Sequence, residues 1–329
     1  MDLKVKRKMN RILLTGSSGF LGKHLLNHFG NSKDIIALSR NSEADFPNSI
    51  FVPNFNSESD FSEAVLNKHC IIHCAARVHV MNDSVNNPLE VYREVNTHGT
   101  ANLARQAAQA GVKRFIFISS IKVNGEGTKQ DKPFTAFDPH APQDDYGVSK
   151  SEAEEALFAI GKETGMEIVV IRPTLVYGPG VKANFASLMN LVSKGIPLPF
   201  ACITQNKRSL VSVTNLVDLI ITCIDHPKAA NQTFLVSDDC DVSTSQMIRE
   251  MAKALGKATW QLSVPIWCYN LTGKLFNKSD VVDRLTGSLQ VDITHTKKTL
   301  GWTPPQTLEE GFKKTAEAFL QSKNNSGNI

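Results

Sequence analysis

The stretch RILLTGSSGFLG, from Arg11 to Gly22, decides the fold class. It begins with an apolar run that ends at Thr15, as a short buried strand does, and continues into three glycines spaced three residues apart. The next residues, 23–29, repeat apolar side chains at helical spacing. The stretch therefore predicts a strand, a glycine turn and a helix. In such a turn, backbone N–H groups at a helix N-terminus can approach a pyrophosphate.

Apolar runs and helical patterns alternate after this turn. Candidate strands cover residues 34–39, 48–53, 70–75, 113–119 and 167–172, and candidate helices cover residues 57–66, 96–110 and 146–165. Nearly continuous apolar strands separated by helices indicate a parallel sheet that is covered on both faces. We therefore expect an α/β protein with a Rossmann-type doubly wound parallel sheet.

The pattern changes after Pro173, where Pro and Gly cluster at 177–180 and 195–199 and the strand and helix signals become irregular. This change predicts a second, smaller lobe of mixed α/β type that binds the substrate. We expect a dinucleotide-binding domain over residues 1–173, to which residues 209–230 return. Residues 174–208 and 231–329 then form the second lobe.

Composition and charge exclude several classes of protein. The chain is 41% hydrophobic and 21% charged, with a net charge of +4, so nothing indicates a nucleic-acid partner. The richest apolar window, 210–224, is interrupted by Asn215 and Asp218, and no secretory signal precedes the glycine turn. A membrane span is therefore excluded, and we expect no membrane partner.

The six cysteines contain no C-x-x-C pair and lie mostly among apolar neighbours. They indicate free thiols and a cytoplasmic location. The cluster closest to a metal-ligand pattern, formed by Cys70, His73 and Cys74, lies on a predicted strand whose side chains alternate between faces. We therefore expect no metal.

The glycine turn is the expected cofactor site, although plain turn chemistry explains the same residues. The contacts predicted for the dinucleotide are Gly16, Ser18, Gly19, Phe20, Leu21 and Gly22. Arg40 follows the second predicted strand, where an arginine can accommodate the extra phosphate of NADP, and the acids Glu43 and Asp45 lie beyond the strand end. Arg40 is equally compatible with a solvated turn, so both NAD and NADP stay open.

Tyr146 and Lys150 are the expected catalytic pair. They are four residues apart on a predicted helix, so their side chains lie on one face, about 6 Å apart. A nearby lysine cation and a positively charged nicotinamide both favour the phenolate of a tyrosine, which then works as a general acid/base. Ser119 and Ser120 end the preceding strand, at the edge where open α/β sheets bind ligands. The alternative is a half-buried tyrosine beside a surface lysine.

Four motifs together resemble the extended short-chain dehydrogenase/reductases: the glycine turn, SSIKVNG at 119–125, Y-x-x-x-K at 146–150 and RPTLVYGPG at 172–180. Within that group, the chain is similar to the NAD-dependent epimerase/dehydratase family of nucleotide-sugar enzymes. It looks most like the UDP-glucose 4-epimerases and the 4-keto-sugar reductases of surface-polysaccharide synthesis. The resemblance implies that Tyr146 is the acid/base, that Lys150 is its electrostatic partner and ribose anchor, and that Ser120 binds the sugar oxygen.

The same resemblance implies further ligand contacts. The cofactor would also meet Ala75, Ala76, Asn96, Ser119 and Pro173. The second lobe, residues 174–208 and 231–329, would be the nucleotide-sugar-binding lobe. The substrate, a nucleotide-diphosphate sugar that is UDP-linked, would meet Asn184, Arg208 and Arg284 there, the two arginines lying on the diphosphate. Either arginine is equally well explained as a surface charge. The resemblance also implies a homodimer, formed through the helix after Tyr146 and the helix near Asn96.

Departures from the family pattern narrow the reaction. Ile121 and Lys122 stand where the 4,6-dehydratases need an acidic pair, so we reject dehydration. Asn124 and Leu175 also depart from the epimerase pattern and leave the sugar open. We expect a 4-epimerase that works through a transient 4-keto sugar. A reductase of a UDP-4-keto-6-deoxy-hexose is the alternative, favoured by Arg40, and a non-catalytic dinucleotide sensor is a third possibility.

Overall fold

The structure of the protein is a computed structural model that describes residues 12–30, 32, 34–41, 46–78, 87–129 and 131–326. The chain divides into two compact units. The first unit combines Met1–Val123, His140–Arg172 and Ile220–Phe234, and the second combines Asn124–Pro139, Pro173–Leu219 and Leu235–Ile329. The chain therefore passes repeatedly from one unit to the other, and residues 124–139 and 209–219 group with the second unit.

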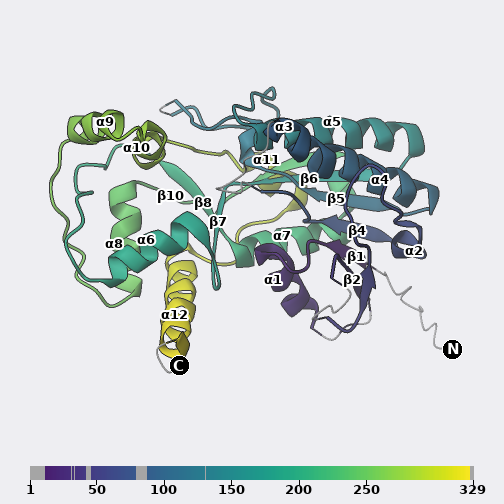
Figure 1. Ribbon diagram of the computed structural model, residues 1–329, viewed down its shortest axis with the longest axis horizontal. Helices are drawn as coiled ribbons and strands as arrows, with labels where there is room; N and C mark the ends of the chain where they lie inside the picture. The colour runs from purple at the N-terminus through teal and green to yellow at the C-terminus, as the bar shows by residue number, and fades with distance from the viewer. Residues whose placement is uncertain are drawn as a thin grey trace. The chain divides into compact units, whose positions relative to one another are not determined.

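A seven-stranded sheet with the order β3-β2-β1-β4-β5-β6-β9 organises the first unit (Figure 1). Its strands are β1 (Ile12–Thr15), β2 (Ile35–Ser39), β3 (Ser49–Phe51), β4 (Cys70–His73), β5 (Arg114–Ile118), β6 (Glu167–Pro173) and β9 (Gln232–Val236). All neighbouring pairs from β3 to β6 are parallel. The strand order reverses between β1 and β4, which is the point where doubly wound sheets bind ligands. The expected Rossmann-type sheet is confirmed.

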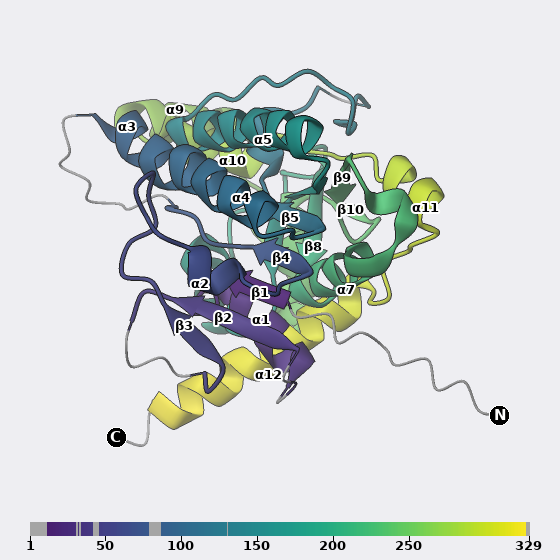
Figure 2. The same ribbon diagram turned by 90° about the vertical axis from the view of Figure 1, so that its right-hand side faces the viewer.

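Helices cover this sheet because its strands are apolar on both faces. They are α1 (Phe20–Phe29), α2 (Ser62–Val65), α3 (Pro88–Tyr92), the π-helix η1 (Arg93–Gly99), α4 (Thr100–Gln109), the 3₁₀ turn η2 (Ile121–Val123), α5 (Asp145–Thr164), α7 (Val213–Asp225) and the 3₁₀ turn η3 (Pro227–Ala229). Helices α4 and α5 lie side by side over one face (Figure 2). Buried side chains such as Leu103, Phe115, Leu157 and Ile168 fill the space between them and the sheet.

The second unit contains a smaller mixed sheet, as expected. Strands β7 (Leu175–Tyr177) and β8 (Arg208–Ser212) are parallel, and β10 (Asp241–Val242) is antiparallel to β8. Its helices are α6 (Ala183–Ser193), α8 (Thr244–Ala254), α9 (Ile266–Leu275), α10 (Ser279–Thr286), α11 (Thr294–Leu300) and α12 (Leu308–Ser326). The rings of Tyr177, Phe185 and Phe312 contact one another in the core of this unit, and those of Tyr177 and Phe185 are stacked. Helices α9 and α10 were not predicted from the sequence.

Candidate active site

The glycine turn lies between β1 and α1 and closes against the residue that follows β4. Gly16 has a φ of +72°, and a Cβ there would lie 2.7 Å from the backbone nitrogen of Ala75. A Cβ on Gly22 would lie 2.1 Å from the carbonyl oxygen of Gly16. Both positions therefore accept only glycine, because the obstacles are backbone atoms that cannot rotate away.

The start of α1 fits the pyrophosphate of a dinucleotide. Gly19 caps the helix without a side-chain hydrogen bond, and the first turn has no acidic residue. The first N–H groups of a helix have no intrahelical partner, so those at Phe20 and Leu21 can bind an anion there. Ser18 stands in the turn beside them. The residues predicted to hold the cofactor's phosphates are therefore contiguous and are not shielded by a carboxylate of the first turn.

Ala75 and Ala76 lie in the loop after β4, and Ala75 packs against Gly16 of the glycine turn. The Ala75 N–H donates to Thr15 Oγ1 at 3.1 Å, which fixes the loop to the end of β1. The buried Asn96 holds the same loop, because its side chain accepts from the Arg77 N–H at 2.8 Å and donates to the Arg77 carbonyl at 3.0 Å. Its amide also donates to Ser149 Oγ on α5 at 3.0 Å. Asn96 thus connects the glycine-turn region to the helix that carries Tyr146.

Lys150 is buried on α5, and its ammonium group contacts β5. Its Nζ donates to the carbonyl oxygen of Ile118 at 2.9 Å and lies 4.3 Å above the centre of the Phe117 ring. The distance from Nζ to the centre of the Tyr146 ring is 6.0 Å, so the pair shares one helix face as predicted from its spacing. Burial lowers the pKa of Lys150 to about 8, although Cys74 and Glu154 act to raise it.

Tyr146 lies in the first turn of α5, which begins at Asp145. The N-cap of this helix is Asp144, whose side chain accepts from the Gly147 N–H at 2.7 Å. Burial raises the pKa of Tyr146, and the negative charge of Asp144 and the neighbouring Tyr92 raise it further. The protein's own groups therefore keep the phenol protonated, which is opposite to the shift expected from the Tyr-Lys spacing alone.

Ser119 and Ser120 both follow β5 but make different contacts. The Ser119 hydroxyl donates to the buried Glu154 on α5. Ser120 Oγ accepts from the Lys122 N–H at 3.2 Å, and Ser120 is only partly buried. The Lys122 ammonium pairs with Asp144 at the N-terminus of α5, so the loop that carries Ser120 is tied to the helix turn that carries Tyr146.

A buried ionic network behind Ser119 was missed in the sequence. Arg172, near the end of β6, donates from Nε to Glu154 Oε1 at 2.9 Å and from Nη2 to Glu154 Oε2 at 2.5 Å. Burial alone raises the pKa of Glu154, but hydrogen bonds from His140, Arg172 and Ser119 outweigh it, and the pKa is lowered. The available signal was the position of Glu154, one turn after Lys150 on the same helix face.

The remaining cofactor candidates lie at strand ends. Arg40 directly follows β2 and is exposed, and residues 42–45, including Glu43 and Asp45, lie outside the described part of the chain. Pro173 is the buried last residue of β6. Both stand at the carboxyl ends of parallel strands, the edge at which such sheets bind ligands.

In the second unit, the structure brings Arg208 and Arg284 together. Arg208, the first residue of β8, donates from Nη1 to the carbonyl oxygen of Arg284 at 2.8 Å and to that of Gly287 at 3.3 Å. Burial lowers the pKa of Arg208, and the positive charge of Arg284 lowers it further. Two guanidinium groups of like charge at one place suit a diphosphate. Asn184 lies on α6, and its side chain is outside the described part of the chain.

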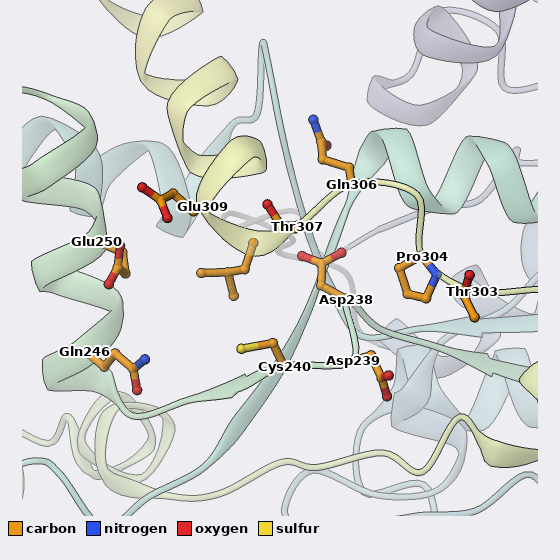
Figure 3. A pocket seen from close by; sticks show the side chains of 11 residues that line it. Asp238, Asp239, Cys240, Gln246, Glu250, Thr303, Pro304, Gln306, Thr307 and Glu309 are labelled. Atoms are coloured by element: carbon orange, nitrogen blue, oxygen red, sulfur yellow. The ribbon is translucent and has the colours of Figure 1, made fainter.

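A separate cavity of about 510 Å³ in the second unit has a different character (Figure 3). The carboxylates of Asp238, Asp239, Glu250 and Glu309 line it, and none of the predicted site residues does. Asp238 accepts hydrogen bonds from Tyr177 at 2.7 Å and from the Ser212 N–H at 2.8 Å, so it holds the core of the unit together. An acidic lining repels a diphosphate, and this cavity is not the substrate site.

Neither a cluster of metal ligands nor a membrane-spanning helix occurs among the described residues. No group of three or more His, Cys, Asp and Glu there is placed to hold a metal ion. None of the helices in the described ranges has the length and apolar character needed to cross a bilayer.

A Rossmann-type sheet, a glycine turn at its switch point and a Tyr-Lys pair on the helix after β5 together define a short-chain dehydrogenase/reductase. The chain belongs to the NAD dependent epimerase/dehydratase family, whose family model matches residues 12–237.

Comparison with known proteins is consistent with this family assignment. A Vibrio cholerae protein named UDP-glucose 4-epimerase is 65% identical over 322 residues, covering 97% of this chain and 98% of that protein. The solved structure of UDP-glucose 4-epimerase from Thermotoga maritima with UDP-glucose has a TM-score of 0.74 at 21% identity, covering 95% of this chain and 99% of that one. The structure of UDP-glucuronic acid 4-epimerase from Bacillus cereus with NAD has a TM-score of 0.73 at 17% identity, covering 95% of this chain and 99% of that one. Both structures share the fold.

Proposed function

We propose that this protein is a nucleotide-sugar epimerase that inverts carbon four of a UDP-hexose, as in the conversion of UDP-glucose to UDP-galactose. The observation that carries the proposal is the Tyr146-Lys150 pair on α5, beside the loop of Ser120, in a chain that is 65% identical to a UDP-glucose 4-epimerase over nearly its whole length. That identity favours epimerisation over the reductase alternative. Its product would serve the synthesis of surface polysaccharides.

The chain's own residues divide the chemistry between them. Without cofactor the Tyr146 phenol is protonated; the positive charges of Lys150 and of bound NAD would together favour its phenolate, which takes the proton of the sugar's C4 hydroxyl and later returns it as a general acid/base. Lys150 contributes its charge on the same helix face, and the Ser120 hydroxyl holds the C4 oxygen in place. Arg208 and Arg284 bind the diphosphate, and Asn184 contacts the nucleotide. NAD, held by the glycine turn, would supply the acceptor for the C4 hydride and the donor that returns this hydride to the other face of the 4-keto sugar.

We propose NAD as the cofactor. The glycine turn, Gly16–Gly22, would hold its pyrophosphate, and Ala75, Ala76, Asn96, Ser119 and Pro173 would contact its nicotinamide half. An epimerase uses its cofactor without net oxidation, so it has no need of the separate NADPH pool. The position of Arg40, which is compatible with the extra phosphate of NADP, is therefore not decisive. Titration of the protein with NAD and NADP tests this choice. Tighter binding of NADP, lost in Arg40→Ala, would contradict it.

We also propose that the protein works in the cytoplasm as a homodimer. On α5, the helix that the resemblance assigns to the dimer contact, Ala153 and Leu157 are buried within the first unit itself. Phe158 is only partly buried and is the residue of this stretch best suited to a partner. Light scattering should give twice the mass of one chain for the wild type and a single mass for Phe158→Glu.

The catalytic proposal is tested with Tyr146→Phe. The variant should lose about 10²- to 10⁴-fold in kcat for the interconversion of UDP-glucose and UDP-galactose, because it removes the acid/base group. NAD binding should persist, since the glycine turn is unchanged. Tyr269→Phe is the matched control, because the buried Tyr269 hydroxyl has no hydrogen-bond partner among the described residues. Full turnover by Tyr146→Phe would refute the acid/base role.

A further inference from the structure

Helix α9 of the second unit exposes an apolar stripe that no part of the proposed reaction uses. Trp267, Leu271 and Leu275 are 65%, 60% and 75% exposed. They are spaced four residues apart and therefore lie along one side of the helix. Phe276, directly after the helix, is 68% exposed. These four residues are called the α9 apolar face below. Large apolar side chains gathered in this way mark a binding surface.

The opposite side of α9 already packs within the second unit. Tyr269 stacks on Phe200, with ring centres 6.4 Å apart, and adjoins the unit's core. Gly273 lies against α10 so closely that a Cβ there would be 2.7 Å from Val282 Cγ2. Because these inner contacts hold the helix in place, the α9 apolar face is not required for folding and is available to bind something else.

The charge around this face is positive. Residues 257–279 contain Lys257, Lys274 and Lys278 and no Asp or Glu. Lys274 is exposed on α9 beside Leu275, and Lys278 is exposed three residues after the end of the helix. The next acids, Asp280 and Asp283, belong to α10. Tryptophan, leucine and phenylalanine flanked by lysine are typical of helices that lie in the surface of an anionic membrane.

We propose that the α9 apolar face docks this protein onto an anionic lipid bilayer. Trp267, Leu271 and Leu275 enter the boundary between headgroups and acyl chains, where tryptophan is favoured, and Lys274 and Lys278 meet lipid phosphates. A ten-residue helix is roughly 15 Å long and lies in the surface without spanning it. The sequence-based expectation of no membrane partner rested on the lack of a spanning segment, and surface docking goes beyond it and beyond the proposed function.

Vesicle binding by the full-length protein tests the proposal without substrate. The wild type should co-sediment with vesicles of phosphatidylethanolamine and phosphatidylglycerol, bind phosphatidylcholine vesicles less, and dissociate as salt is added, because salt screens the lysines. The emission of Trp260 and Trp267, which are 60% and 65% exposed, should shift to shorter wavelength on binding. Trp302, the remaining tryptophan, is buried and should contribute no shift.

Two variants with matched controls locate the surface. Trp267→Ser combined with Leu271→Ser should raise the lipid concentration needed for half-binding by about tenfold or more, since it removes the inserted side chains. Leu66→Ser, at an equally exposed leucine of the first unit, should bind as the wild type does. Lys274→Glu combined with Lys278→Glu should abolish the preference for phosphatidylglycerol, whereas Lys162→Glu on α5 should retain it.

Three results would overturn the proposal. The first is that the wild type does not bind vesicles, and the second is that both double variants bind vesicles as the wild type does. The third is that the wild type does not bind vesicles but self-associates, and that Trp267→Ser with Leu271→Ser abolishes this self-association. The last result would assign the face to a second copy of the chain. Far-ultraviolet circular dichroism checks the fold of each variant. If the apolar double variant does not fold, the lysine double variant decides the outcome. Epimerase activity on a soluble UDP-sugar is measured alongside, so failure of docking and failure of the proposed reaction remain distinguishable.

Discussion

At the scale of single residues, spacing predicted where Tyr146 and Lys150 lie but not how their environment acts on them. The two side chains share one face of α5, as a separation of four residues requires. The direction of each pKa shift depends on burial, which comes from β5, from the loop after β4 and from Tyr92, all far away in the sequence. The same reason explains why the Ser119-Glu154-Arg172 network was missed: its members come from β5, α5 and β6.

The depressed pKa of Lys150 gives a pH dependence with a definite sign. Burial lowers the pKa to about 8 in the folded protein, against about 10.4 for an unfolded lysine. Between these values the unfolded chain binds more protons, so this residue makes the free energy of unfolding rise as pH increases from 8 towards 10. The wild type should therefore gain about 2 kcal/mol relative to Lys150→Met over that interval.

Urea unfolding at pH 8, 9 and 10 measures this difference. Lys162→Met serves as the control for the loss of a lysine side chain, because Lys162 lies exposed near the other end of α5. A constant difference between the wild type and Lys150→Met would show that Lys150 titrates alike in both states.

At the scale of elements, apolar patterning predicted those segments that are buried on one or both sides. The strands β1, β4 and β5 are continuous apolar runs that the sheet buries, and their positions were found to within two residues. Helix α9 was missed because it is apolar on its exposed side as well as on its inner side, so no periodic contrast marks it. The same property that concealed this helix from the sequence analysis makes it the strongest candidate for a docking surface.

The glycine turn gives a prediction at this scale that needs no ligand. A Cβ at position 22 would lie 2.1 Å from the backbone oxygen of Gly16, whereas a Cβ at position 19 would lie 3.1 Å from the same atom. Gly22→Ala must therefore open the turn and should cost about 1–3 kcal/mol in the free energy of unfolding, more than Gly19→Ala costs. Denaturant titration of both cofactor-free variants measures the order. Equal losses would mean that the turn relaxes as a whole.

At the scale of the whole molecule, the chain passes from one unit to the other within single helices and strands. The division crosses helix α7 between Leu219 and Ile220 and strand β9 between Phe234 and Leu235, so neither unit is one continuous segment. The sequence analysis used the change of composition after Pro173 and expected one return, over residues 209–230, where the division groups Ile220–Phe234 with the first unit. It did not expect Asn124–Pro139 to group with the second unit, because composition carries no information on which segments meet in space. The assignment of the cofactor to the first unit and of the sugar to the second stays a prediction.

Because α7 and β9 each carry residues of both units, we expect the units to unfold in one cooperative step. All three tryptophans, Trp260, Trp267 and Trp302, belong to the second unit, whereas the proposed NAD site lies in the first. NAD at about 100 times its Kd should stabilise the folded state by about 2.7 kcal/mol and raise the melting temperature reported by tryptophan fluorescence by several degrees. Gly22→Ala, with its opened turn, should show a smaller rise. The contrary outcome is that NAD raises the melting temperature measured by far-ultraviolet circular dichroism but not the one measured by tryptophan fluorescence. The two units would then unfold separately, although they share α7 and β9.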